Sequence, residues 1–132
     1  NHSYNHPYDK EKPLDETFLL RPGTDLEKEI LSTEILLLEH GLLPSVFFRF
    51  PGLVSDCNLI RRLKAFSLIP VGSRAWLAKG EKPREGSIIL VHGNGNEPAG
   101  IDILLDIFRG RADAFTRGRW TLLPLNAAVA DP

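Results

Sequence analysis

The stretch G-S-I-I-L-V-H-G, residues 86 to 93, constrains the fold of this chain more than any other. Its apolar run is continuous rather than alternating, which is typical of a strand that is covered on both faces. Such strands occur in parallel sheets that carry helices on each side. The stretch therefore predicts an α/β protein.

Helical patterns lie on either side of this strand. A first helix is expected from Thr24, where T-D-L-E forms a capping box, to a stop at Gly41. A second is expected after a cap at Ser55, and a third from about Pro98 to Gly110. The intervening segments predict strands, and the sequence before the first helix predicts a surface loop at residues 8 to 23. The expected strands are residues 44 to 51, 68 to 72 and 120 to 125.

Composition sets the class of protein. The 132 residues, 42% of them hydrophobic and 25% charged, indicate one globular domain over residues 1 to 132. A net charge of -1 gives no electrostatic reason to expect nucleic acid or a membrane surface as a partner. Cys57 is the only cysteine, so neither an intramolecular disulfide nor a thiolate cluster is expected, and no apolar run is long enough to predict a transmembrane segment. The sequence contains no methionine and opens on Asn1, and we expect it to be part of a longer protein.

Candidate catalytic and binding residues lie where the expected strands end. These stretches are R-F-P-G from Arg49, G-S-R-A-W from Gly72 and L-V-H-G-N-G-N from Leu90. In parallel α/β folds the carboxyl ends of the strands meet at one edge, where ligands bind. If Asn1 closes a further strand, His2 and His6 join the same edge. Neutral imidazoles suit zinc, but two are too few for a complete site.

Taken in order, these motifs resemble the polysaccharide deacetylase family of carbohydrate esterases, which remove N- or O-acetyl groups from sugars. The stretch H-S-Y-N-H-P is similar to the family's H-(S/T)-x-x-H metal motif. R-F-P-G resembles its R-x-P-x-G stretch, although here the glycine follows the proline directly. L-V-H, which ends at His92, resembles its L-x-H motif. The resemblance covers residues 1 to about 108 and implies a partial, mostly parallel (β/α) barrel that lacks its first strands.

The resemblance also implies roles for individual residues. His2 and His6 would bind a divalent metal, most often zinc, and the third ligand and the catalytic base would come from a paired aspartate motif upstream of Asn1. Arg49 and His92 would be catalytic, the first by positioning a carboxylate and the second by protonating the leaving group. Three further residues would contact substrate. They are Leu90, which would line a pocket for the acetyl methyl group, Trp76 and Pro51.

One position departs from the family pattern. Arg74 stands where an aspartate is expected, and residues 71 to 79 contain no acid. The sequence therefore predicts that His92 and Arg49 lack an acidic partner. The expected function is metal-dependent deacetylation of an acetylated polysaccharide or oligosaccharide, with the chain alone inactive. The alternative is a non-catalytic carbohydrate-binding relative that uses Trp76 as a platform.

Two other enzyme classes fit less well. I-L-V-H-G also resembles the oxyanion strand of an α/β-hydrolase, but no serine follows His92 to form a nucleophile elbow. G-N-G-N-E-P lacks the G-K-(S/T) of a phosphate-binding loop. The sequence does not fix a compartment, and the family includes periplasmic, cell-surface and secreted proteins. An open barrel edge would favour an oligomer.

Overall fold

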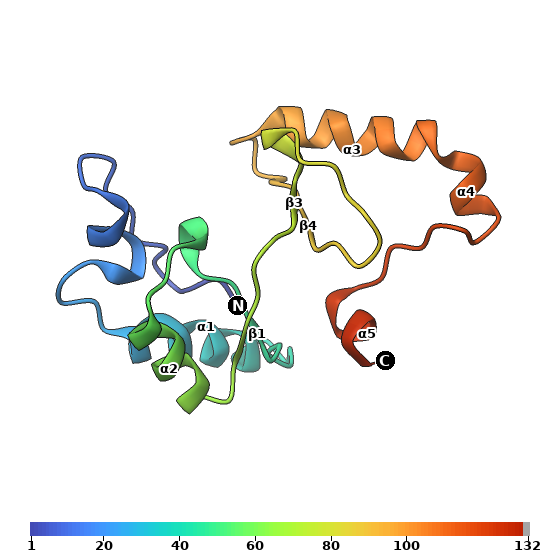
Figure 1. The fold of residues 1–132 in the computed structure, drawn as a ribbon. Helices are drawn as coiled ribbons and strands as arrows, with labels where there is room; N and C mark the ends of the chain where they lie inside the picture. The colour runs from blue at the N-terminus through green and yellow to red at the C-terminus, as the bar shows by residue number, and fades with distance from the viewer. Residues whose placement is uncertain (131–132) are drawn as a thin grey trace. The chain divides into compact units, whose positions relative to one another are not determined.

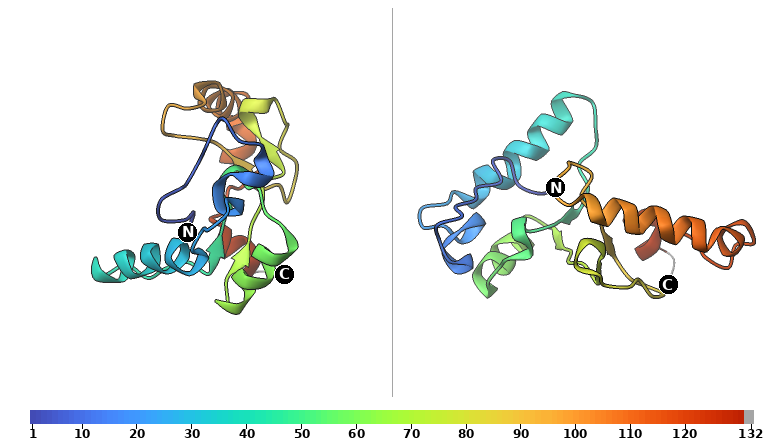
Figure 2. Two further views of the ribbon diagram at one scale, coloured as in Figure 1. Left: turned by 90° about the vertical axis from the view of Figure 1, so that its left-hand side faces the viewer. Right: turned by 90° about the horizontal axis from the view of Figure 1, so that it is seen from above.

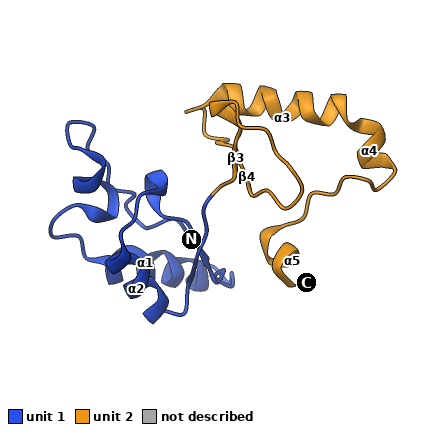
Figure 3. Ribbon diagram, viewed as in Figure 1, with its two compact units in different colours: residues 1–72 blue, residues 73–132 orange. Residues whose placement is uncertain are grey.

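The structure is a computed structural model that describes residues 1 to 130. The chain divides into two compact units, the first spanning Asn1–Gly72 and the second starting at Ser73 (Figure 3). Each unit contains one small parallel sheet together with its helices. No helix among the described residues combines the length and apolar character that crossing a membrane requires.

The first unit is built on two α-helices and one pair of strands (Figure 1). Its elements are two 3-10 turns at Leu14–Glu16 and Phe18–Leu20, α1 at Leu26–Glu39, β1 at Phe47–Phe48, a 3-10 turn at Pro51–Leu53, α2 at Cys57–Ala65 and β2 at Ile69–Pro70. The core packs one face of each helix against the strand segment. Its fully buried members include Leu26 and Ile30 from α1, Phe48 from β1 and Leu63 from α2.

The second unit is dominated by one long helix. Its elements are β3 at Ala75–Trp76, a 3-10 turn at Leu77–Lys79, β4 at Ile89–Leu90, α3 at Pro98–Gly110, α4 at Ala112–Thr116 and α5 at Leu125–Ala130. Figure 2 shows α3 running on into α4. The first turn of α3 packs on the 3-10 turn, where a Cβ at Gly100 would lie 3.4 Å from the Ala78 side chain. Ala75 and Leu77 are fully buried in this contact region.

The expectation of a partial (β/α) barrel is wrong. The described residues contain two separate two-stranded sheets, with β1 beside β2 and β3 beside β4. Both pairings are parallel, but each strand has only two residues. Sheets of two strands cannot form a barrel. The open barrel edge that was expected to favour an oligomer is therefore absent from the described residues. The continuous apolar run at residues 88 to 91 correctly located a strand but did not specify how many neighbours it has.

Several element boundaries also differ from the sequence expectation. Asp25, not Thr24, caps α1, because its side chain accepts a hydrogen bond from Lys28 N. Asp56 likewise replaces Ser55 as the cap of α2 and accepts from Leu59 N. The strand expected at residues 120 to 125 is absent, since residues 121 to 124 have no regular structure and α5 begins at Leu125.

Candidate functional site

Asn1 extends the first sheet by one residue. Its backbone N donates to Phe47 O and its carbonyl accepts from Arg49 N, both at 3.0 Å. These two bonds are the pattern that a residue of a neighbouring parallel strand makes. Because Asn1 pairs with β1 in this way, His2 lies beside Arg49, at the carboxyl end of β1.

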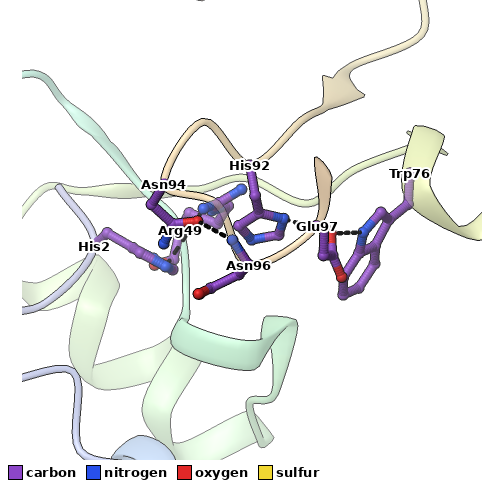
Figure 4. A network of polar contacts seen from close by, with 7 residues as sticks. All are labelled: His2, Arg49, Trp76, His92, Asn94, Asn96 and Glu97. Carbon is purple, nitrogen blue, oxygen red and sulfur yellow. Dashed lines mark hydrogen bonds and ion pairs between the residues drawn. The ribbon is translucent and has the colours of Figure 1, made fainter. Parts of the chain in front are cut away.

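His2 is held by the Arg49 backbone. Its Nδ1 lies 2.7 Å from Arg49 O, and because a carbonyl only accepts, Nδ1 carries the proton (Figure 4). Nε2 is then the lone-pair nitrogen, with Arg49 Nη2 at 3.4 Å. Burial lowers the pKa of His2, opposed by the bond to the Arg49 carbonyl and reinforced by the Arg49 charge. The lowered pKa favours the neutral form of His2, in which Nε2 is an acceptor.

His6 lies next to His2 on a strained loop. The two imidazole centroids are 4.9 Å apart in an edge-to-face arrangement. Ser3 and His6 both have positive φ, 69° and 47°, which is costly for residues with a Cβ. Such strain persists only where the surroundings hold the backbone in place.

Glu29 on α1 supplies that hold. It is 6% exposed, and its two carboxylate oxygens accept from Asn5 N at 2.9 Å and from Asn5 Nδ2 at 2.6 Å. The backbone carbonyl of Glu29 also accepts from Tyr4 N at 2.8 Å. Glu29 thus fastens the loop that carries the two histidines to α1, together with the Asn1 side chain, which donates to Ile30 O and Glu34 Oε1. The sequence analysis did not identify Glu29.

The histidine pair offers two imidazoles, which are donors that a divalent metal takes. A backbone carbonyl on Nδ1 that leaves Nε2 as the ligand atom is the usual arrangement of a metal-binding histidine. The neutral state of His2 is also the one that binds metal. No group of three or more His, Cys, Asp or Glu side chains with metal-site spacing occurs among residues 1 to 130. The pair is therefore a partial donor set.

The R-F-P-G stretch supports this region by packing. Pro51 is almost fully buried, so it offers little surface to a substrate. Gly52 has φ of 64°, and a Cβ built on it would lie 2.3 Å from the Phe18 ring. Only glycine fits both the backbone conformation and the ring. The ring of Phe18 in turn contacts His6 edge-on, with 5.8 Å between centroids.

A second cluster lies in the second unit, where His92 follows β4. His92 Nδ1 and Trp76 Nε1 both contact Glu97 Oε2 at 2.7 Å (Figure 4). The bond from Trp76 is the largest effect that lowers the pKa of Glu97, and the bond and charge of His92 and the charge of Lys79 add to it, while desolvation opposes them. Glu97 is therefore an anionic acceptor. His92 Nδ1 donates its proton toward this oxygen, and the other ring nitrogen, Nε2, takes no part in the bond.

Glu97 corrects the expectation that His92 has no acidic partner. The acid lies five residues after His92, at the cap position before Pro98, and not near Arg74. The available signal was an acidic residue directly before a first-turn proline, since the start of α3 brings the chain back toward the end of β4. The loop between them is turned by Asn94, whose Oδ1 accepts from Asn96 N at 3.2 Å.

Trp76 is engaged on several sides. Lys79 Nζ lies 3.6 Å from its ring centroid, its indole N–H is bonded to Glu97, and its backbone N donates to Glu81 at 2.7 Å. It stands within β3 and pairs with Leu90 of β4, which is 6% exposed. These contacts position Trp76 as a support for the Glu97 carboxylate.

The structure thus forms two groups from the expected site residues. His2, His6, Arg49 and Pro51 lie in the first unit, and Trp76, Leu90 and His92 lie in the second. No protein-family model matches the chain, and no solved structure resembles it significantly. The functional assignment therefore depends on the chemistry of these two groups.

Proposed function

We propose that this chain is part of a metal-dependent hydrolase that removes acetyl groups from a polysaccharide, as its motifs suggest. The observation that carries the proposal is the His92–Glu97 pair, with 2.7 Å between Nδ1 and Oε2. A carboxylate on Nδ1 is the arrangement that fixes the tautomer and orientation of a general acid-base histidine. The similarity of L-V-H to the L-x-H motif also suggested His92 as the residue that transfers a proton.

The motif resemblance gives each group a role in the proposed reaction. Water adds to the acetyl carbonyl, the carbon-nitrogen or carbon-oxygen bond breaks, and acetate leaves. His92 delivers a proton from Nε2 to the departing amine or alkoxide, while Glu97 stabilises the positive charge of the imidazolium before that transfer. His2 and His6 would hold a divalent metal, which supplies Lewis-acid activation of the carbonyl.

Two parts of the proposed site are not supplied by His2, His6, His92 or Glu97. A third metal ligand and a base that activates water are expected from an aspartate pair preceding Asn1. The chain alone is therefore proposed to be inactive. The alternative is a carbohydrate-binding relative without catalysis, which Arg74 favours because it replaces an expected acid.

Acetate release tests the proposal. The substrates are acetylated chitooligosaccharides and acetylxylan, and the protein is the longest reading frame that encodes this chain. His92→Ala should lower turnover by about 10²- to 10⁴-fold, the usual value of a general acid, with bound metal unchanged. His40→Ala is the matched control, because the exposed His40 side chain at the end of α1 contacts the Leu36 carbonyl and neither histidine group.

Each result has a clear meaning. Unchanged turnover in His92→Ala would remove this histidine from the mechanism. Absence of acetate release from every acetylated glycan, together with retained glycan binding, would establish the binding-protein alternative. Turnover that survives complete removal of metal would contradict the role given to His2 and His6.

A further inference from the structure

An exposed aromatic ring stands beside the histidine pair and has no assigned role. Tyr8 is 62% exposed, yet it is stacked on Phe18 with 4.9 Å between centroids and 22° between planes. Stacking covers one face of the Tyr8 ring and leaves the other toward solvent. Tyr4, by comparison, is 50% exposed and makes none of the aromatic contacts found among the described residues.

The Tyr8 ring is held in place by the Phe18 ring on which it stacks and by the backbone on either side of it. Phe18 is 8% exposed, has φ of 50°, and lies against Gly52 where no side chain would fit. The backbone after Tyr8 is fixed because Asp9 N donates to the Oγ1 of Thr17 at 2.8 Å, and Thr17 is 1% exposed. Pro7, directly before Tyr8, has its own φ fixed by the proline ring. Tyr8 is thus an exposed ring with a rigid support.

Its location links it to the proposed metal ligands. The Phe18 ring contacts Tyr8 on one side and the His6 imidazole on another, at 4.9 Å and 5.8 Å between centroids. His6 in turn contacts His2. A ligand that covers Tyr8 and His6 together would therefore be a chain of more than one building block, such as an oligosaccharide.

The charges around Tyr8 disfavour an anionic ligand. Lys10 approaches Glu11 at 4.0 Å and Lys12 approaches Glu16 at 3.8 Å, so both lysines that follow Tyr8 lie beside an acid. Phosphate or a polyanion would find no concentrated positive charge here. An aromatic face suits the apolar C–H face of an uncharged sugar ring, and the Tyr8 hydroxyl adds a donor and acceptor at its edge.

We propose that the outer face of Tyr8 is a stacking subsite for a neutral pyranose ring, one or more sugars away from the His2–His6 pair along a glycan. The identity of the ligand as an acetylated glycan rests on the proposed function. The subsite itself requires no catalysis, and it can be measured on the 132-residue chain. Pre-organised stacking needs little ordering of the protein when the sugar binds.

Titration with N-acetylated chitotetraose, followed by NMR and calorimetry, tests the subsite. Tyr8→Ala should weaken binding by about 2- to 10-fold, the range of a stacked ring pair. Tyr8→Phe should bind within about twofold of the original, since the ring is kept. Tyr4→Ala, which removes a 50% exposed ring without the Phe18 support, should bind unchanged. In the original chain the Tyr8 ring protons should shift on binding, a readout that does not depend on any variant folding.

The outcomes separate this inference from the proposed function. Equal affinity in Tyr8→Ala, an equal loss in Tyr4→Ala, no shift of the Tyr8 ring, or no binding by the original chain would each overturn the subsite. Acetate release that is insensitive to Tyr8→Ala would leave the deacetylase proposal standing without this subsite. Tyr8-dependent binding without acetate release by the longest reading frame would support the subsite and remove the enzymatic function.

Discussion

His92 Nδ1 and Glu97 Oε2 are 2.7 Å apart, and the same oxygen accepts a hydrogen bond from the Trp76 indole. One carboxylate thereby ties the end of β4 to β3 at the start of α3. Both donors favour the charged form of the acid, which is why the pKa of Glu97 lies below its ordinary value of 4.5. A group whose pKa is depressed by folding contributes stability above its unfolded pKa and loses it as the pH falls through the folded value.

The first prediction follows from that sign. Glu97→Gln should lower the melting temperature at neutral pH, because the amide is a weaker acceptor for the two donors. The difference from the original chain should be fully present above about pH 4.5 and should shrink as the pH falls below it. Thermal denaturation followed by circular dichroism between neutral and acidic pH measures this. A difference that grows on acidification would contradict the assignment.

The second prediction concerns Gly52. Gly52→Ala should destabilise the chain by about 2 to 4 kcal/mol, because it adds left-handed backbone strain to a steric conflict with Phe18. Gly23→Ala is the matched control: Gly23 also has positive φ, 80°, but a Cβ there would meet nothing within 4 Å. The control should cost only the strain, about 1 to 2 kcal/mol. Urea denaturation of both variants should separate them, and equal costs would show that the Phe18 contact contributes nothing.

The outcome of sequence-based prediction can be traced to particular residues. The bounds of α3 were predicted because Pro98 and Gly110 mark its ends locally. The barrel was wrong because apolar strand patterns indicate burial and not the number of paired residues, and β1 and β4 pair over only two each. Strand β3 was missed because G-S-R-A-W lacks the composition of a strand, although its backbone pairs with Leu90.

Some contacts within the candidate site could be predicted from short motifs, and others could not. Short motifs named His2, Arg49 and His92, and the structure shows His2 bonded to Arg49. The supporting acids, Glu29 and Glu97, were not identified. Their roles depend on how α1 and the start of α3 return to the loops, which is a property of packing that no local pattern encodes.

The third prediction tests Glu29 as the anchor of the histidine loop. Glu29→Ala leaves both Asn5 donors without their buried acceptor and should cost about 1 to 3 kcal/mol. Amide exchange at Tyr4 and Asn5 should become faster. Glu27→Ala, an exposed acid in the same helical turn, should change neither quantity appreciably. Protected Tyr4 and Asn5 amides in Glu29→Ala would show that the loop is held by other contacts.

The fourth prediction concerns metal binding by the chain alone. Zinc should bind weakly, because two imidazoles offer half of a tetrahedral site and Arg49 Nη2 lies 3.4 Å from the expected ligand atom of His2. His2→Ala and His6→Ala should each reduce the affinity by at least about tenfold, since each removes a ligand. His40→Ala removes an exposed histidine at the end of α1 and should have no effect. Calorimetric titration with zinc measures all four proteins. A tight one-to-one site that survives His2→Ala would show that the metal binds elsewhere, and equal losses in the His40 variant would indicate nonspecific binding to surface imidazoles.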